Sequence, residues 1–209
     1  MRILIADDHA VVRKGVKQIL LEEYPFCQIE ECANAEEMIH KIINNKFDII
    51  ISDISMPGRS GIDALRQIHA SFPNLPVLML SMYPEEQYAF RAFKAGAAGY
   101  FTKDMADAEL ITAVKKVLSG RKYITPTLAE VLVDQLGKEE PTTLPHEHLT
   151  DREFDVFKLL ASGQSISKIA DMLSLSTATI STYRSRILKK MKLSTNADLT
   201  RYALEKKLI

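Results

Sequence analysis

Asp48–Gly58 reads DIIISDISMPG, an apolar run that ends in a carboxylate and a Pro-Gly turn. Three other apolar runs also end in polar side chains: Arg2–Asp8 (RILIADD), Val77–Ser81 (VLMLS) and Gly99–Lys103 (GYFTK). A fifth run, Gln28–Ala33 (QIEECA), lies between the first and third runs of the chain. Short and nearly continuous apolar runs indicate strands that are buried on both faces, as in a parallel sheet.

Segments with helical spacing separate these runs. Apolar residues recur at helical intervals over residues 12–20, 38–43, 62–69, 88–93 and 110–118. A strand followed by a helix, five times over, predicts an α/β fold in which helices cover both faces of a doubly wound five-stranded parallel sheet. We expect the flavodoxin-like strand order 2-1-3-4-5.

Polar side chains follow four of the expected strands at their carboxyl ends: Asp7 and Asp8, Asp53, Ser81, and Lys103. In this strand order the four ends are neighbours, so the side chains converge on the edge where such sheets bind ligands. Clustered carboxylates repel one another unless a cation neutralises them, and oxygen ligands favour a hard divalent ion such as Mg²⁺. A carboxylate beside Mg²⁺, an ammonium group and a hydroxyl is equipped to accept a phosphoryl group.

Each of these residues has an ordinary alternative role when it is taken alone. Asp7 and Asp8 could cap the first helix, and Asp53 could begin the turn that follows it. Lys103 could be a solvated surface lysine, and Ser81 an ordinary hydroxyl at a strand end. Their joint placement at four strand ends favours a functional pocket.

Residues 1–120 resemble the receiver domain of two-component response regulators. The matching residues are Asp7-Asp8, Asp53 with Met56-Pro57 and Gly61 behind it, Ser81, Tyr100 and Lys103. The resemblance implies that a histidine kinase phosphorylates Asp53. It also implies that Asp8, Asp53 and the backbone carbonyl of Ser55 ligate Mg²⁺, with Asp7 contributing through the acidic pocket.

The same resemblance assigns roles to three residues around the phosphoryl group. Ser81 and Lys103 would contact the phosphoryl oxygens, and Tyr100 would move inward when Ser81 is drawn toward them. A phosphoryl group adds about 1.5 to 2 negative charges and new hydrogen-bond acceptors at one spot. The movement would therefore bias a two-state face around the fourth and fifth strands.

The charge of the chain is zero overall but is divided between its two parts. Up to Pro145 there are 16 basic and 20 acidic residues, and from His146 onward there are 11 basic and 7 acidic residues. An acidic N-terminal segment and a basic C-terminal segment suggest two domains with different partners. We expect a receiver domain over 1–122, a helix and a polar linker over 123–148, with the linker at Gly137–His148, and a second domain over 149–209.

The second domain shows four short helical patterns and no strand signal. Thr150 and Glu153 form a predicted capping box at the start of the first helix. A three-residue turn, Ser174–Ser176, joins the second and third helices, as in a helix-turn-helix. The outward face of the third helix carries small polar residues followed by lysines: Ser181, Thr182, Ser185, Lys189 and Lys192. A solvated face on an ordinary helical bundle is the alternative.

Residues 149–209 resemble the LuxR-type helix-turn-helix. The matching segments are LTDRE (149–153), SISKIADML (165–173), STATISTYRSRILKKMKL (176–193) and NADLTRYAL (196–204). The resemblance implies that three residues contact base edges: Ser181, Thr182 and Ser185. It implies that four residues contact the DNA backbone: Thr179, Arg184, Lys189 and Lys168. Members of the family often carry Lys or Val where this chain has Ser181 and Thr182, so the DNA sequence that is read cannot be transferred from relatives.

The whole chain resembles a response regulator of the NarL/FixJ family. The resemblance implies a transcription factor that is phosphorylated at Asp53, forms a homodimer and binds double-stranded DNA, with a histidine kinase as partner and RNA polymerase as a further candidate. We expect a cytoplasmic protein, because no apolar run approaches the ~18 residues of a membrane span and the N-terminus is unlike a signal peptide. Cys27 and Cys32 are expected to be reduced thiols.

Two other functions are open at this stage. A Mg²⁺-dependent phosphatase of the haloacid-dehalogenase kind also uses an Asp nucleophile, but it needs an acid two residues later, where this chain has Ser55. A constitutive DNA-binding protein, whose receiver serves only for dimer contacts, would have no use for an intact acidic pocket.

Overall fold

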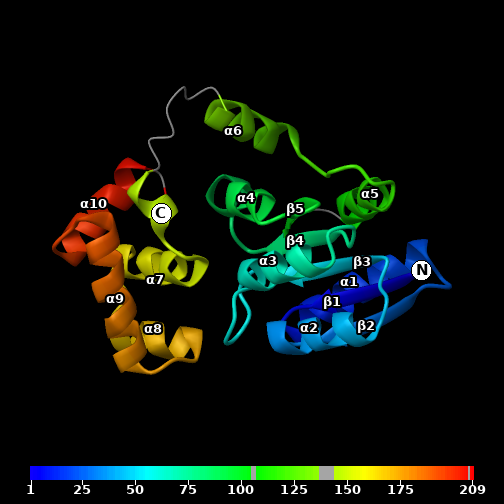
Figure 1. Cartoon of the computed structure of the whole chain (residues 1–209), viewed down its shortest axis with the longest axis horizontal. Helices are drawn as coiled ribbons and strands as arrows, with labels where there is room; N and C mark the ends of the chain where they lie inside the picture. The colour runs from blue at the N-terminus through cyan, green and yellow to red at the C-terminus, as the bar shows by residue number, and fades with distance from the viewer. Residues whose placement is uncertain (105–106, 137–143, 207) are drawn as a thin grey trace. The chain divides into compact units, whose positions relative to one another are not determined.

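The computed structural model of the chain describes residues 1–104, 107–136, 144–206 and 208–209. The chain divides into two compact units, Met1–Lys138 and Glu139–Ile209. Each unit is described by itself below, with the element labels of Figure 1.

Unit 1 is built on a five-stranded parallel sheet in the order β2-β1-β3-β4-β5 (Figure 1). The strands are β1 (Arg2–Ala6), β2 (Gln28–Cys32), β3 (Ile49–Asp53), β4 (Val77–Ser81) and β5 (Gly99–Thr102). The three central strands are almost entirely buried, as their continuous apolar runs predict. The fold class and the strand order expected from the sequence are confirmed.

Five helices alternate with these strands: α1 (Ala10–Glu23), α2 (Ala35–Asn44), α3 (Gly61–Ser71), α4 (Glu85–Lys94) and α5 (Asp107–Leu118). Helix α1 contacts α5, whereas α3 contacts both α2 and α4. One core cluster joins Ile3 and Ile5 of β1 to Leu20 of α1 and Val114 of α5. Burying such side chains away from water contributes about 1.5–3 kcal/mol each, and this burial keeps the strand ends in register.

Helix α6 (Pro126–Leu136) belongs to unit 1 and packs on α4. The Thr125 hydroxyl donates to the Glu85 carboxylate at the start of α4 and accepts the Leu128 N–H (3.1 Å). The Leu128 side chain is fully buried. The helix expected after residue 123 is therefore present, and among its described residues the Thr125–Glu85 hydrogen bond and the burial of Leu128 accompany its packing on α4.

Unit 2 contains a short 3₁₀ turn, η1 (Pro145–His148), and four helices: α7 (Asp151–Ala161), α8 (Ile166–Leu173), α9 (Thr177–Met191) and α10 (Asn196–Glu205). The Thr150–Glu153 capping box predicted at the start of α7 is confirmed. Ser174, with φ of 53°, makes the left-handed turn that joins α8 to α9. The expected four-helix helix-turn-helix domain is confirmed.

The expected linker Gly137–His148 is structured at its end. Its first part, residues 137–143, lies outside the described residues. At Pro145–His148 the chain forms η1, and the His146 Nδ1 lies 2.8 Å from the Tyr202 hydroxyl of α10. The His146 ring also faces Phe154 of α7, with ring centroids 6.0 Å apart. A single histidine packed on two aromatic rings gives no periodic signal, so the sequence pattern did not predict the contacts of His146. The domain boundaries themselves stay a prediction.

Candidate functional site

Three charged side chains meet at the carboxyl ends of the strands of unit 1. Asp7 directly follows β1 and is fully buried, and Asp53 ends β3 with 2% of its surface exposed. Lys103 follows β5, and its Nζ lies 2.7 Å from Asp7 Oδ2 and 3.0 Å from Asp53 Oδ2. The Lys103 side chain is only 5% exposed. A buried ammonium group therefore bridges two buried carboxylates.

Asp8 and His9 complete an acidic cluster at this edge. One ligand atom from each of Asp7, Asp8, His9 and Asp53 lies within 4.8 Å of the others. His9 Nδ1 lies 2.7 Å from Asp8 Oδ1, and the His9 backbone N–H donates to Asp7 Oδ1 (2.8 Å). Three carboxylates in this space form a donor set that suits a hard divalent cation such as Mg²⁺. Our sequence reasoning missed His9, although its place next to Asp7-Asp8 was a visible signal.

The electrostatics of the pocket follow from burial and charge pairing. Burial raises the pKa of the Asp53 carboxyl above its usual value, the charge of Asp7 adds to this rise, and Lys103 opposes it. For Lys103, burial acts to lower the pKa, but the negative charges of Asp53 and Asp7 outweigh it and raise the pKa. Lys103 is therefore a permanent cation here, and the pocket still carries more carboxylates than ammonium groups.

The alternative roles considered for these residues were helix capping by Asp7 and Asp8, a turn at Asp53 and a solvated Lys103, and the structure favours the pocket instead. Helix α1 has His9, rather than Asp7 or Asp8, at its N-cap, and the Asp7 carboxylate also pairs with Lys103. Lys103 is buried rather than solvated. Asp53 receives a hydrogen bond from the Ser55 backbone N–H and faces Lys103. The Ser55 carbonyl stays a predicted ligand.

Ser81 and Tyr100 are linked through a residue that the sequence did not single out. Ser81 ends β4, and its Oγ accepts the Tyr83 N–H (3.0 Å). Tyr100 is fully buried in β5, and its hydroxyl donates to the Tyr83 carbonyl oxygen (2.8 Å). The Tyr83 ring stacks on Tyr88 of α4, with centroids 4.7 Å apart. Tyr83 therefore connects the strand ends to α4, and its single ring in a loop carries no sequence signal.

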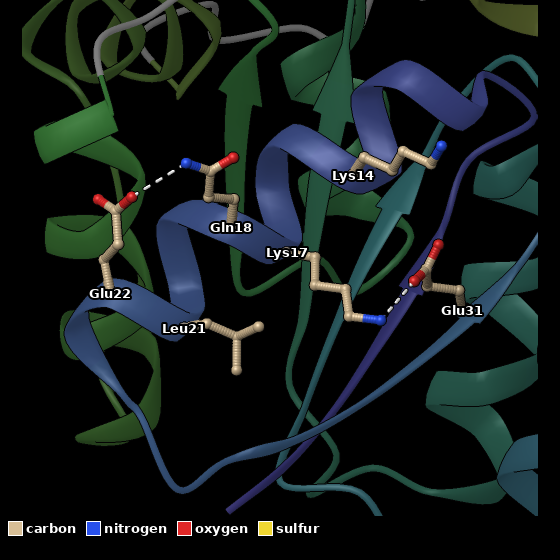
Figure 2. Close-up of a pocket in the computed structure, with 6 residues that line it drawn as sticks. All are labelled: Lys14, Lys17, Gln18, Leu21, Glu22 and Glu31. Carbon is tan, nitrogen blue, oxygen red and sulfur yellow. Dashed lines mark hydrogen bonds and ion pairs between the residues drawn. The ribbon is translucent and has the colours of Figure 1, made fainter.

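A separate hollow of about 520 Å³ lies on the outer side of α1 and β2 (Figure 2). Its lining residues are Lys14, Lys17, Gln18, Leu21, Glu22 and Glu31. Figure 2 shows the Lys17 ammonium paired with Glu31 (2.8 Å) and the Gln18 amide donating to Glu22 (3.2 Å). Polar groups that already pair with one another offer little to a ligand, so we place the function of unit 1 at the strand ends.

In unit 2 the predicted DNA-contacting residues fall into two groups. Four of them are exposed along one face of α9, and a fifth is exposed on α8: Ser181, Thr182, Ser185 and Lys189, and Lys168. The other two are half-buried and hold local structure. The Thr179 hydroxyl oxygen lies 2.8 Å from the Ser176 hydroxyl oxygen, which caps α9. Arg184 Nε donates to Asn196 Oδ1 (2.7 Å) at the start of α10.

Sequence comparison assigns both units to known families. Residues 3–115 match the response regulator receiver domain, and residues 147–203 match the luxR family of bacterial regulatory proteins. The chain belongs to the two-component response regulators. Within them it is of the NarL/FixJ type, and it is a DNA-binding transcription regulator with a LuxR-type domain.

Relatives of this response regulator match between 65% and 100% of its length. It is 37% identical over 215 residues to the oxygen regulatory protein NreC of Staphylococcus carnosus. This match covers 100% of this chain and 99% of that protein. A LuxR-family response regulator of Aurantimonas sp. SI85-9A1 is 34% identical, with a TM-score of 0.59 over 65% of this chain and 96% of its own. RcsB of Salmonella typhimurium is 25% identical, with a TM-score of 0.58 over 97% of each chain.

Membership of this family excludes one of the two other functions that the sequence left open. This response regulator is not a conventional enzyme, which excludes the phosphatase. The receiver domain implies a kinase partner, and Asp7, Asp8 and Asp53 form the acidic pocket that is typical of a Mg²⁺ site. Within the described residues, no helix combines the length and the apolar character that a membrane crossing requires.

Proposed function

We propose that this response regulator is a transcription factor that is switched on by phosphorylation of Asp53. The observation that carries the proposal is the Asp53 carboxylate at the end of β3, almost completely buried and 3.0 Å from the Lys103 ammonium group. A carboxylate oxygen in this position can attack the phosphorus of a phosphohistidine. The new O–P bond replaces the P–N bond, and the histidine of the kinase leaves with a proton on its nitrogen.

Lys103 neutralises the charge that the phosphoryl group brings into the pocket. Its ammonium group already lies between Asp7 and Asp53, so it needs only a small movement to reach a phosphoryl oxygen. Asp8, Asp53 and the Ser55 carbonyl would hold Mg²⁺, with Asp7 contributing through the pocket. When bound, the ion would neutralise the remaining phosphoryl charge. This division of labour is consistent with a pocket that holds three carboxylates and one ammonium group.

The signal would leave the pocket through Ser81. A Ser81 hydroxyl that donates to a phosphoryl oxygen turns away from the Tyr83 N–H, which it accepts in the present structure (3.0 Å). Tyr83 also accepts the Tyr100 hydroxyl and stacks on Tyr88. A shift at Ser81 would therefore reposition Tyr100 and the first turn of α4 together, which gives the receiver two discrete arrangements.

The output would be the binding of two LuxR-type domains to DNA. Ser181, Thr182 and Ser185 would face base edges, while Lys189, Lys168, Thr179 and Arg184 would lie along the phosphates. A homodimer would present two α9 helices about one DNA turn apart, and the second contact would be intramolecular and so favourable. RNA polymerase is a further candidate partner of the bound dimer.

The test is incubation of the full chain with Mg²⁺ and acetyl phosphate, followed by mass spectrometry, sedimentation and DNA binding. We expect a gain of about 80 Da for one phosphoryl group, dimer formation and tighter binding to duplex DNA. Asp53→Asn should show none of these changes. Asp48→Asn, which alters an exposed aspartate before β3, should behave as the parent protein.

Two outcomes contradict the proposal. Uptake of the phosphoryl group by Asp53→Asn would place the acceptor elsewhere. Equal DNA affinity and oligomeric state with and without the phosphoryl group would identify a constitutive DNA-binding protein instead.

A further inference from the structure

The exposed face of α9 begins with hydroxyl groups whose protons are already in use. Ser181 Oγ donates to the Thr177 carbonyl (2.9 Å), and Thr182 Oγ1 donates to the Ala178 carbonyl (3.0 Å). Ser185 Oγ donates to the Ser181 carbonyl (3.1 Å). A carbonyl oxygen can only accept, so each hydroxyl proton is directed into the helix. What these side chains offer to a ligand is therefore oxygen lone pairs.

Methyl groups lie beside these oxygens. Ala178 is exposed one turn before Thr182 on α9, and Thr182 carries a γ-methyl group. At Ala178, Ser181, Thr182 and Ser185 the recognition helix thus presents hydrogen-bond acceptors and carbon, because the hydroxyl protons at these positions are bonded within the helix.

The cationic side chains of α9 that could donate lie elsewhere. Arg184 is half-buried, and its Nε is bonded to Asn196 (2.7 Å). The Lys190 ammonium group pairs with Glu153 of α7 (2.5 Å). Arg186 and Lys189 are exposed but lie in the second half of the helix. In a helix-turn-helix the N-terminal residues of the recognition helix meet the base edges, and residues further along contact the backbone.

We propose that α9 reads A·T base pairs, through acceptor oxygens on the adenine amino group and through methyl contacts on thymine, and that it does not read guanine. In the major groove adenine presents an N6 amino donor and thymine a C5 methyl group, so one A·T pair matches both features of the helix. Guanine presents two acceptors, N7 and O6, which would face acceptors and carbon and lose their water. Cytosine also offers an amino donor, but in a G·C pair this donor lies beside the N7 and O6 acceptors of the paired guanine. A G·C pair therefore does not match the helix as an A·T pair does.

This inference rests on the proposed DNA-binding function and is tested on the full chain treated with acetyl phosphate and Mg²⁺. Duplexes are first selected from a random pool, and the affinity of a selected duplex is then measured by fluorescence anisotropy. Replacing thymine by uracil removes a methyl group, and we expect about fourfold weaker binding for each contacted methyl. Replacing adenine by purine, which lacks the amino group, should also weaken binding. Replacing guanine by 7-deazaguanine should leave the affinity unchanged.

Thr182→Val separates the two kinds of contact, because valine keeps the methyl group and removes the acceptor. We expect uracil substitution to weaken the DNA binding of this variant as it weakens that of the parent. At one position, replacement of adenine by purine should no longer weaken its binding. Thr112→Val is the matched control, since Thr112 is an exposed threonine of α5 whose hydroxyl makes the same kind of bond to the Ala108 carbonyl (2.8 Å). It should bind every duplex as the parent does.

The outcomes distinguish failure of this inference from failure of the proposed function. A loss of affinity with 7-deazaguanine, with no response to uracil or purine, overturns the A·T readout while DNA binding stands. A full chain that binds no duplex at low salt, with or without the phosphoryl group, overturns both.

Discussion

Gly61 lies against the backbone of Asp53 and Ile54. It begins α3, and its N–H donates to the Ile54 carbonyl (2.8 Å). A Cβ atom at this position would lie 2.0 Å from the Asp53 carbonyl oxygen and 3.1 Å from Ile54 Cα. Both atoms belong to the backbone and cannot rotate away. Any side chain at position 61 would therefore displace the strand end that carries Asp53.

Gly61→Ala should lower the free energy of unfolding by about 1–3 kcal/mol, as overpacking does, and should slow phosphoryl uptake. Gly15→Ala is the matched control, because a Cβ at this exposed position of α1 meets nothing within 4 Å. It should stabilise the protein by up to about 1 kcal/mol. Urea unfolding and mass spectrometry measure the two effects; equal stability of both variants would show that the backbone adjusts freely at Gly61.

Burial also separates the two cysteines. Cys32 is buried at the end of β2, and burial raises the pKa of its thiol to about 12. Cys27 is half-buried before β2. Since only the thiolate reacts, iodoacetamide at pH 8 should label Cys27 in the folded protein and leave Cys32 unlabelled, whereas both should react in urea. Peptide mass spectrometry gives the answer, and rapid labelling of native Cys32 would refute it.

At the scale of elements, one ion pair joins α7 to α9 in the DNA-binding unit. The buried Glu153 carboxylate accepts the Lys190 ammonium group (2.5 Å) and the Thr150 N–H (2.8 Å). Burial acts to raise the pKa of Glu153, but these hydrogen bonds outweigh it and lower the pKa below 4.5. A carboxyl whose pKa is lower in the folded state stabilises the fold above its ordinary pKa, and this contribution is lost as the pH falls through the folded value.

Glu153→Gln should remove the ion pair and keep the capping box, because a glutamine oxygen can still accept the Thr150 N–H. We expect a loss of about 1 kcal/mol at pH 7, moderated by the partial exposure of Lys190, and no difference from the parent once the pH is well below 4.5. Hydrogen exchange of the α7 and α9 amides measures this unit alone. Arg201→Gln, which breaks an exposed pair with Asp198, is the control and should change little. If the difference in stability between Glu153→Gln and the parent stayed the same at low pH, packing and not the ion pair would be its cause.

At the scale of the whole molecule, opposite charges are divided between two units with different tasks. The segment up to Pro145 carries 16 basic and 20 acidic residues, and the segment from His146 carries 11 basic and 7 acidic residues. The proposed phosphoryl chemistry belongs to the acidic segment, where Lys103 is buried between carboxylates. The basic segment exposes Arg186 and Lys189 on α9, where they can replace the counterions of DNA.

Lys189→Ala should weaken binding to all duplexes about equally and should lower the slope of log affinity against log salt by about 0.9, the value for one phosphate contact. Lys14→Ala, a change of an exposed lysine on α1 of the receiver, should leave both quantities unchanged. Anisotropy titrations from low to moderate salt on several unrelated duplexes check this. A loss confined to one DNA sequence would make Lys189 a base-reading residue.

Much of the receiver could be predicted because its signals are local. Apolar runs that end in Asp7, Asp53, Ser81 and Lys103 predict both the strands and the edge at which those side chains meet. The capping residue Thr150 also acts within one turn of its helix, and its capping box with Glu153 is found as predicted. Tyr83 and His146 were not predicted, because their contacts with residues of other elements follow no hydrophobic period. His9 was not predicted either, although it lies next to Asp7-Asp8 in the sequence.

The amino-acid sequence by itself determined the strands, the acidic strand ends and the hydroxyl face of the recognition helix, because hydrophobic periodicity and residue type act over a few positions. The fold alone decided that Lys103 is buried between two carboxylates, that Tyr83 joins Ser81 to Tyr100, and that Arg184 of α9 donates to Asn196 at the start of α10. These contacts join residues from different elements, and their strength depends on distances and on exclusion of water that only packing creates.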